Sequence, residues 1–183
     1  MARKRGIRIV IVVEDSMLDR FCRTALLELG YHKREIRVEM APAGKGSAKQ
    51  WVDARLPIEV AMIRTKPDQK LAVLVGSDVD ELDHRDRVRR LTDELGAAEL
   101  APRRTDERIA WWLPKWSVET WLLYFAGEQV DEATRHKHKV NYPDFKNAAH
   151  AFIAEYRQPQ SAKSTKTLPT LHEAHIETIR IDS

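Results

Sequence analysis

The sequence predicts an α/β domain in which a parallel sheet of about four strands is flanked by helices. Short apolar runs rich in branched residues alternate, three or four times, with segments that repeat apolar residues at helical spacing. The run at 71–75 is apolar throughout, which is typical of a buried parallel strand. We therefore expect a sheet covered by helices on both faces, with right-handed crossovers.

The first half of the chain supplies three of the expected strands, at 7–13, 36–40 and 71–75. A helix over 17–29 should be capped by Ser16 and end at Gly30. A second helix should begin after Ser47 and be broken or restarted at Pro57, because proline lacks the N–H that an interior turn needs. A third helix is expected over 84–95.

The fourth strand is expected at 108–113, followed by a short apolar helix over 116–125. Beyond residue 127 the pattern weakens, and helices are expected only at 145–156 and 168–181. The predicted packing residues of the last helix are Leu171, Ala174, Ile176 and Ile179. We interpret 1–127 as the principal domain and 128–183 as a helical C-terminal extension of it.

Composition limits the function classes. The chain has 183 residues, of which 43 % are hydrophobic and 32 % charged, as in a globular protein. No apolar run has membrane-spanning length, and the basic start leads into a strand rather than a cleavable signal, so we expect a cytoplasmic protein. The single cysteine, Cys22, allows no internal disulfide and suits a reducing compartment.

The net charge of +3 is small, but the basic residues are clustered. Each cluster by itself is best interpreted as a solvated helix face or loop, whereas several together suit a phosphate-rich partner. The clusters are Arg85–Arg90, Arg103–Arg104, Arg135–Lys139 and Lys163–Lys166.

Three carboxylates follow two of the apolar runs. Asp78 and Asp80 come after the run at 71–75, and in an extended chain residues i and i+2 point to the same side. Glu14 follows the first strand; if the two strands are neighbours they lie roughly 5 Å apart. Because hard oxygen ligands suit Mg²⁺ or Mn²⁺, the pattern predicts a metal site there. The alternatives are an acidic turn with Asp80 capping the next helix, and a Glu14 that faces water.

These segments resemble a known fold family. VVEDSMLDRF is similar to the glutamate motif of the Toprim fold, and VLVGSDVDELDHRDR to its DxD motif, although Asp15 stands where a glycine often follows the glutamate. PKWSVETWLLYF, at 114–125, resembles a segment of the small Toprim-like proteins related to RloB, and the OLD-type nucleases carry the same fold. The resemblance covers roughly residues 7 to 127.

The resemblance implies a Mg²⁺- or Mn²⁺-dependent nuclease of DNA or RNA in phage defence. Asp78 and Asp80 would bind the metal, and Glu14 would bind it or act as general acid/base. A partner ATPase of the ABC or AAA type, or a second copy of the chain, would also fit. The alternatives are a Toprim module that binds nucleic acid or an ATPase with little activity, and a phosphatase or nucleotidyl-transferring domain.

Glu119 is a further candidate catalytic residue. As the only acid in the helix at 116–125, it either stabilises the helix dipole or approaches Asp78 and Asp80. Of the tryptophans, only one of Trp112 and Trp116 is expected to be exposed. Other features are set aside: Gly44–Ser47 is expected to be a flexible loop, and the His136/His138 pair to be solvated.

Overall fold

The computed structural model describes residues 6–44, 46–66, 69–136, 142–159 and 167–182. In chain order the elements are β1 (Arg8–Val13), α1 (Ser16–Glu28), the 3₁₀ helix η1 (Lys33–Glu35), β2 (Ile36–Met40), α2 (Ala48–Thr65), β3 (Leu71–Gly76), α3 (His84–Ala97), β4 (Ile109–Trp112), α4 (Val118–Phe125), α5 (Tyr142–Tyr156) and α6 (Pro169–Asp182).

The four strands form one parallel sheet in the order β2-β1-β3-β4, so the α/β prediction is confirmed. The condition under which Glu14 and Asp78 were expected to meet is fulfilled, since β1 pairs with β3 along its length and Val13 lies opposite Gly76. The segments that follow β1 and β3 therefore begin side by side at the carboxyl edge of the sheet.

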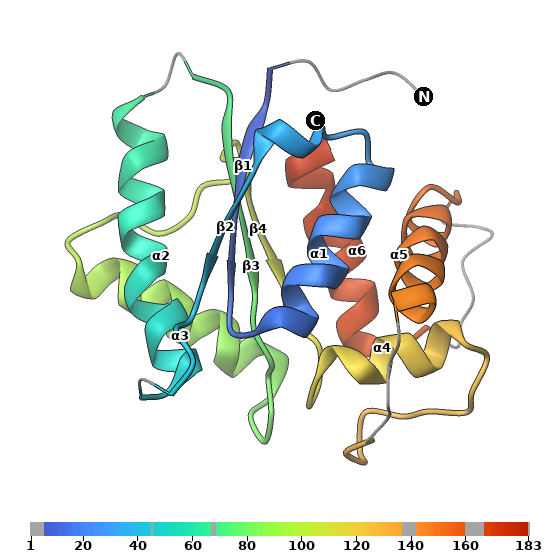
Figure 1. Cartoon of the computed structure of the whole chain (residues 1–183). Coiled ribbons are helices and arrows are strands. Elements are labelled where there is room, and N and C mark those ends of the chain that lie inside the picture. Colours follow the sequence, from blue (N-terminus) through green and yellow to red (C-terminus); the bar gives the residue numbers. More distant parts are fainter. Residues whose placement is uncertain (1–5, 45, 67–68, 137–141, 160–166, 183) are drawn as a thin grey trace.

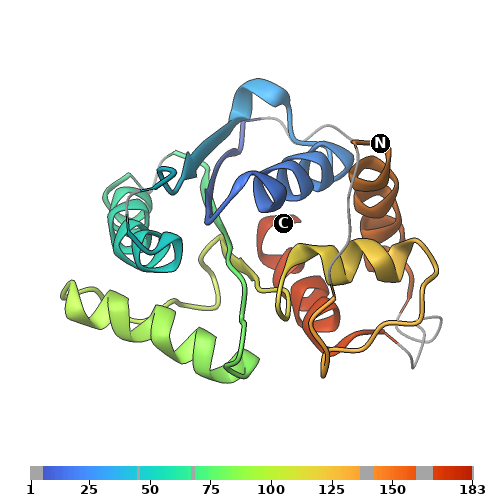
Figure 2. The ribbon, with the colours of Figure 1, turned by 60° about the horizontal axis from the view of Figure 1, so that its bottom comes forward.

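Helices cover both faces of this sheet (Figures 1 and 2). α2 and α3 lie on one face, and α1, α4, α5 and α6 on the other. Alternate side chains of β1 serve the two cores, as the period of two requires: Ile9 and Ile11 pack with α1, and Val10 and Val12 with α2.

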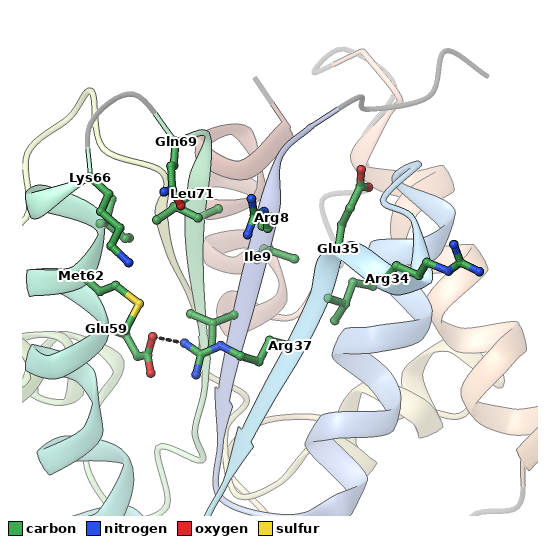
Figure 3. A pocket seen from close by; sticks show the side chains of 14 residues that line it. Arg8, Ile9, Arg34, Glu35, Arg37, Glu59, Met62, Lys66, Gln69 and Leu71 are labelled. Atoms are coloured by element: carbon green, nitrogen blue, oxygen red, sulfur yellow. Dashed lines mark hydrogen bonds and ion pairs between the residues drawn. The ribbon is translucent and has the colours of Figure 1, made fainter.

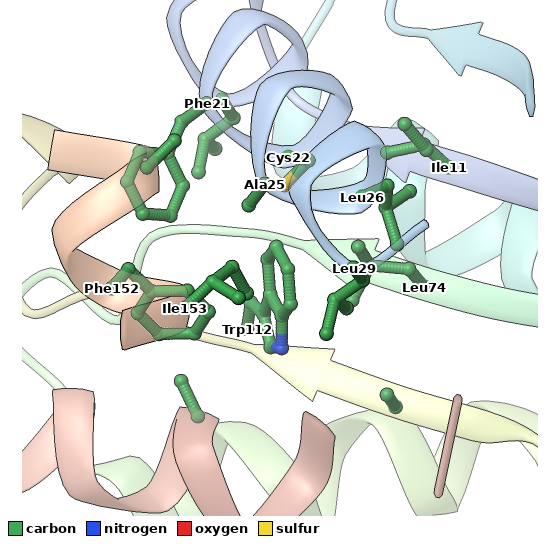
Figure 4. Packing of buried hydrophobic residues seen from close by; sticks show 14 of the residues in the cluster. Ile11, Phe21, Cys22, Ala25, Leu26, Leu29, Leu74, Trp112, Phe152 and Ile153 are labelled. Carbon is green, nitrogen blue, oxygen red and sulfur yellow. The ribbon is translucent and has the colours of Figure 1, made fainter. Parts of the chain in front are cut away.

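The larger core is built around aromatic residues. Trp112 of β4 lies among side chains of α1 and α5, with its ring centroid 5.0 Å from that of Phe152 (Figure 4). Phe21 makes edge contacts with Trp112, Trp121 and Phe152. Helices α1, α4 and α5 thus share one interior with the sheet.

The last helix is also fixed to the sheet and to α1. Thr178 accepts a hydrogen bond of 3.2 Å from the indole of Trp112, and the carbonyl of Ile181 accepts one of 2.6 Å from the Tyr31 hydroxyl. The prediction that Ile176 and Ile179 pack inward was wrong, since their exposed fractions are 43 % and 58 %. The buried stripe of α6 instead follows Leu171, Ala174, His175, Thr178 and Ile181, at helical spacing.

Two local predictions and one alternative were also wrong. Asp15, not Ser16, caps α1, because its carboxylate accepts from the N–H groups of Met17 and Leu18 at 2.8 and 2.9 Å. α2 runs through Pro57 without a break, and the burial of Leu56, Pro57 and Val60 offsets the lost turn bond. α3 is capped by Asp83 rather than by Asp80.

None of the helices in the described ranges combines the length and the apolar character needed to cross a membrane.

Candidate functional site at the carboxyl edge of the sheet

Glu14 and the segment after β3 meet at the carboxyl edge of the sheet. The Glu14 carboxylate accepts a hydrogen bond from the Ser77 hydroxyl and one of 3.1 Å from the backbone N–H of Asp78. This contact follows from the register that sets Val13 opposite Gly76. The structure thus joins Glu14 to the Asp78 segment rather than leaving it in water.

Asp78 carries a buried carboxylate oxygen without a protein partner. Its Oδ1 accepts no hydrogen bond from any described residue. Burial raises the pKa of Asp78 well above the usual carboxyl range, and the negative charges of Glu14, Asp15 and Asp80 raise it further. Burial also raises the pKa of Glu14, against the opposing effects of the Ser77 hydrogen bond and the charge of Lys49. Two carboxylates therefore compete for protons in a small, poorly solvated volume.

Asp80 reaches the same region by a different route from the expected one. The extended strand ends at Gly76, and Asp80 lies in a turn with a φ of 53°. The reasoning that residues i and i+2 of a strand share a side therefore does not apply to Asp78 and Asp80. The Asp80 carboxylate forms an ion pair with Lys49, from the first turn of α2.

Glu119 lies in the first turn of α4 and is partly exposed. Within the described ranges, no hydrogen bond or ion pair joins Glu119 to Glu14, Asp78 or Asp80. The first turn of α4 nevertheless follows a segment that touches the site, because Val79 donates a backbone hydrogen bond of 2.9 Å to Pro114. Glu119 thus stands near the carboxyl edge but outside the hydrogen-bonded group.

A buried arginine supports the site and was not foreseen. Arg87 was expected on a solvated helix face, but its exposed fraction is 0 %. Its Nε and Nη2 donate to the Ser77 hydroxyl oxygen at 3.0 and 2.7 Å, while Nη1 pairs with buried Asp53 at 2.6 Å. The spacing of Arg87 with Leu91 and Leu95, four residues apart each time, was the available signal, because it places Arg87 on the buried stripe of α3.

The donor set suits a divalent cation in part. Within the described ranges, no group of three or more His, Cys, Asp and Glu side chains is assembled as a metal site. The free buried Oδ1 of Asp78 beside the Glu14 carboxylate is nevertheless the arrangement that a hard cation would neutralise. Lys49 pairs with Oδ2 of Asp80, so Asp80 would share its carboxylate with that lysine or separate from it to join these two ligands.

A pocket of about 330 Å³ lies away from this site, at the opposite edge of the sheet (Figure 3). Arg37 of β2 and Glu59 of α2 point toward each other across it and form an ion pair. The buried Glu59 also pairs with Arg55 at 2.6 Å. These charges are compensated within the protein, and the pocket contributes nothing to the carboxyl edge.

The remaining sequence candidates lie as follows. Trp112 is fully buried and Trp116 is partly exposed, as expected for that pair. His136 contacts the carbonyl of Asp131 at 3.1 Å. His138 and the basic residues at 137–139 and 163–166 lie outside the described residues.

Comparison with protein-family models, with curated proteins and with solved structures found no match for the chain.

Proposed function

We propose that the protein is a Toprim-like, metal-dependent nuclease that hydrolyses phosphodiester bonds of DNA or RNA, in the manner of the RloB-related and OLD-type proteins. The observation that carries the proposal is the buried, unpartnered Oδ1 of Asp78 beside Glu14 at the carboxyl edge of a parallel sheet. Ligands of open α/β sheets bind at this edge. A role in phage defence and a partner ATPase belong to the same proposal and rest on the sequence resemblance.

The residues that would hold Mg²⁺ or Mn²⁺ are Glu14 and Asp78, with Asp80 as a third ligand once it separates from Lys49. A bound cation of this kind supplies a polarised phosphate oxygen and a reactive hydroxide. The raised pKa values of Glu14 and Asp78 favour proton uptake when no cation is present, so metal and protons should compete for the same carboxylates.

The chain's own residues hold Glu14 in place. Arg87 donates twice to the Ser77 oxygen, and this leaves the Ser77 hydroxyl hydrogen to donate to Glu14. Arg87 is in turn held by Asp53. Glu14 is therefore fixed by a buried chain of contacts that begins on α2, and its carboxylate would be positioned before substrate arrives.

One observation favours a second candidate, a module that binds nucleic acid or an ATPase and has little activity alone. The ion pair between Lys49 and Asp80 occupies a carboxylate that the nuclease would need. If that pair persists in solution, the site keeps one cation of its own and binds metal weakly.

A cleavage assay tests the proposal. The full chain is incubated with plasmid, single-stranded DNA and tRNA in Mg²⁺, Mn²⁺ or EDTA. We expect metal-dependent cleavage by the native protein and by Asp93→Asn, an exposed carboxylate on α3. We expect none by Asp78→Asn or Glu14→Gln. Intact substrates under every metal condition, with nucleic acid still bound, would support the binding module instead.

Glu119→Gln resolves the role of the fourth candidate residue. As a helix-dipole residue on the surface, Glu119 should contribute less than about 1 kcal/mol to stability. If Glu119 is catalytic, the variant folds normally and does not cleave. Normal cleavage by Glu119→Gln, with Asp78→Asn inactive, would restrict the site to Glu14, Asp78 and Asp80.

A further inference from the structure

A pocket of about 540 Å³ opens beside Asp80 at the carboxyl edge of the sheet. Three cationic side chains line it, Lys49, Arg90 and Arg135, together with the carboxylates of Asp80 and Glu81. Arg135 is exposed, and Arg90 keeps 47 % of its side chain exposed although it pairs with Asp53 at 3.3 Å. Lys49 is ion-paired with Asp80, so Arg90 and Arg135 are the cations with exposed side chains that the pocket offers to a polyanion beside the proposed catalytic carboxylates.

The backbone of this pocket is left-handed at two places, a conformation that aspartate tolerates and that is unfavourable for the bulky Trp116. Three non-glycine residues of the described ranges have a left-handed φ, and two of them, Asp80 at 53° and Trp116 at 66°, line the pocket. A bulky side chain at such a φ costs free energy, and residues of this kind gather at ligand-binding sites. Neither position holds glycine, the residue that adopts this φ most easily, and we therefore consider what the two side chains contribute to the pocket.

Trp116 is fixed in position. Its indole N–H donates a hydrogen bond of 3.1 Å to the carbonyl of Glu132. The Glu132 carboxylate accepts from the backbone N–H of Thr170 at 3.0 Å and from the Thr170 hydroxyl, so the segment that holds the indole is joined to α6. The ammonium of Lys115 lies over one face of the ring, 4.7 Å from its centroid, so a stacked base would use the opposite face. The indole is thus a rigid, partly exposed apolar plate at the wall of a cationic pocket.

A flat aromatic plate beside cations and a cleaving site suits one substrate chemistry. A single-stranded nucleic acid offers phosphates to cations and an unpaired base to an aromatic face, whereas the bases of a duplex are stacked on one another and unavailable. An ordinary phosphate ester would use the cations but leave the indole without a function. A nucleotide with a free base would use the neighbouring charges and the exposed part of the indole together.

We propose that this pocket binds a nucleotide of a single-stranded DNA or RNA, with its base stacked on Trp116 and its phosphates near Lys49, Arg90 and Arg135. The inference rests on the proposed nuclease function, because it names the substrate form that reaches Asp78 and Glu14. Trp116 is a binding residue in this scheme. Because any base can stack on an indole, the pocket would distinguish single strands from duplexes but not one base from another.

Binding is measured by fluorescence anisotropy in EDTA, so that cleavage does not interfere. The probes are a fluorescein-labelled oligothymidylate and a labelled duplex of equal length. The native protein should bind the single strand more tightly. Trp116→Ala should lose about 5- to 150-fold in affinity for the single strand, the range of one base–aromatic stack, and change little toward the duplex.

Trp116→Phe separates stacking from structural support. Phenylalanine keeps an aromatic face but loses the hydrogen bond to Glu132, so it should retain most of the single-strand affinity. Equal losses in Trp116→Phe and Trp116→Ala would overturn the stack and leave Trp116 as a structural residue. Single-strand affinity unchanged in Trp116→Ala, or equal native affinity for duplex and single strand, would also overturn it.

The charges have their own matched control. Arg135→Gln should lower the slope of log affinity against log salt concentration by about 0.7, the value for one phosphate contact on a single strand. Arg89→Gln, an exposed residue of α3 that does not line the pocket, should leave the slope unchanged. Equal slopes in both variants would remove Arg135 from the interface and contradict the proposed path of the strand.

Cleavage assays run in parallel distinguish the two proposals. If Mn²⁺-dependent cleavage is present but Trp116→Ala binds and cleaves single strands normally, the nuclease stands and the pocket assignment fails. If single strands bind through Trp116 and no metal supports cleavage, the pocket assignment stands and the nuclease fails.

Discussion

The guanidinium of Arg87 donates two hydrogen bonds to the hydroxyl oxygen of Ser77, although neither side chain reaches solvent. A buried cation needs a countercharge, and Asp53 supplies it: its Oδ1 lies 2.6 Å from Nη1 of Arg87, an ion pair that lacks the geometry of a hydrogen bond. The pair thus links the core beneath α3 to the hydrogen bond that orients Glu14.

Arg87→Met should lower the free energy of unfolding by about 3–5 kcal/mol, because it leaves Asp53 buried without its main partner. Urea denaturation measures the loss. Arg89→Met, on the same helix with 73 % of its side chain exposed, should change stability by less than about 0.5 kcal/mol. Adding Asp53→Asn to Arg87→Met should recover part of the lost stability. A double variant that is less stable than Arg87→Met would contradict the pairing.

Asp78→Asn should make the metal-free protein more stable at neutral pH. Because the folded pKa of Asp78 is raised, the folded state binds the proton more tightly than the unfolded state. The associated stability is present in acid and is lost as pH rises from the usual carboxyl range through the raised value. Asparagine carries no such charge, so the variant should gain over the native protein as pH rises.

Thermal unfolding in EDTA between pH 4 and pH 8 tests this prediction. Each gain of about 1 kcal/mol should raise Tm by about 2–4 °C in a chain of this size. Added Mn²⁺ should stabilise the native protein and leave Asp78→Asn unchanged. Asp93→Asn is the matched exposed control; a fall in the Tm of Asp78→Asn at neutral pH would contradict the raised pKa.

Alanine substitutions at Gly76 and Gly96 should have opposite effects on stability. A Cβ at Gly76 would lie 2.9 Å from Cγ1 of Val13 and 3.3 Å from Sγ of Cys22, so Gly76→Ala should cost about 1–3 kcal/mol through overpacking. A Cβ at Gly96, inside α3, meets nothing within 4 Å. Gly96→Ala should therefore gain about 0.5–1 kcal/mol from helix propensity. Chemical denaturation of both variants measures the contrast, and a destabilised Gly96→Ala would refute the open environment.

Cys22 should report on unfolding. Its thiol is fully buried, and burial raises its pKa, so little of the reactive thiolate forms. A water-soluble disulfide reagent such as DTNB should react only as fast as the core opens, and urea should accelerate the reaction in step with loss of helical signal. Rapid reaction of the native protein would place Cys22 in a locally open region.

The strands and most helices could be predicted because their signals are local. Runs of apolar residues, mostly Ile, Val and Leu, define β1 and β3, and helical spacing defines α1 and α3. The helix break expected at Pro57 is absent because burial of the helix offsets the lost hydrogen bond, and this burial cannot be inferred from the local sequence. In α6 the burial of Leu171 and Ala174 was predicted correctly, but His175 and Thr178 are buried where Ile176 and Ile179 were expected.

Some residues of the candidate site could likewise be predicted from local sequence, and others could not. Glu14 and Asp78 were placed together because parallel strands end at one edge, which is a rule of the fold. Arg87, Asp53 and Lys49 reach that edge from helices distant in sequence, and only the packing of α2 and α3 decides where they point. Asp80 was paired with Asp78 on the assumption of an extended chain, but the turn after Gly76 sets its direction instead.

The strand order has a consequence for refolding from denaturant. β1 is a central strand, and its uncharged run from Ile9 to Val13 needs both β2 and β3 to cover its edges. Because β3 lies far along the chain, the edge of this run that β3 covers stays open during the early collapse, and a short apolar segment of high β-propensity is then free to pair there with the same segment of another molecule. Recovery of native protein should therefore fall as the protein concentration during dilution rises. Charged substitutions that flank β1 should extend the range of protein concentrations over which refolding succeeds.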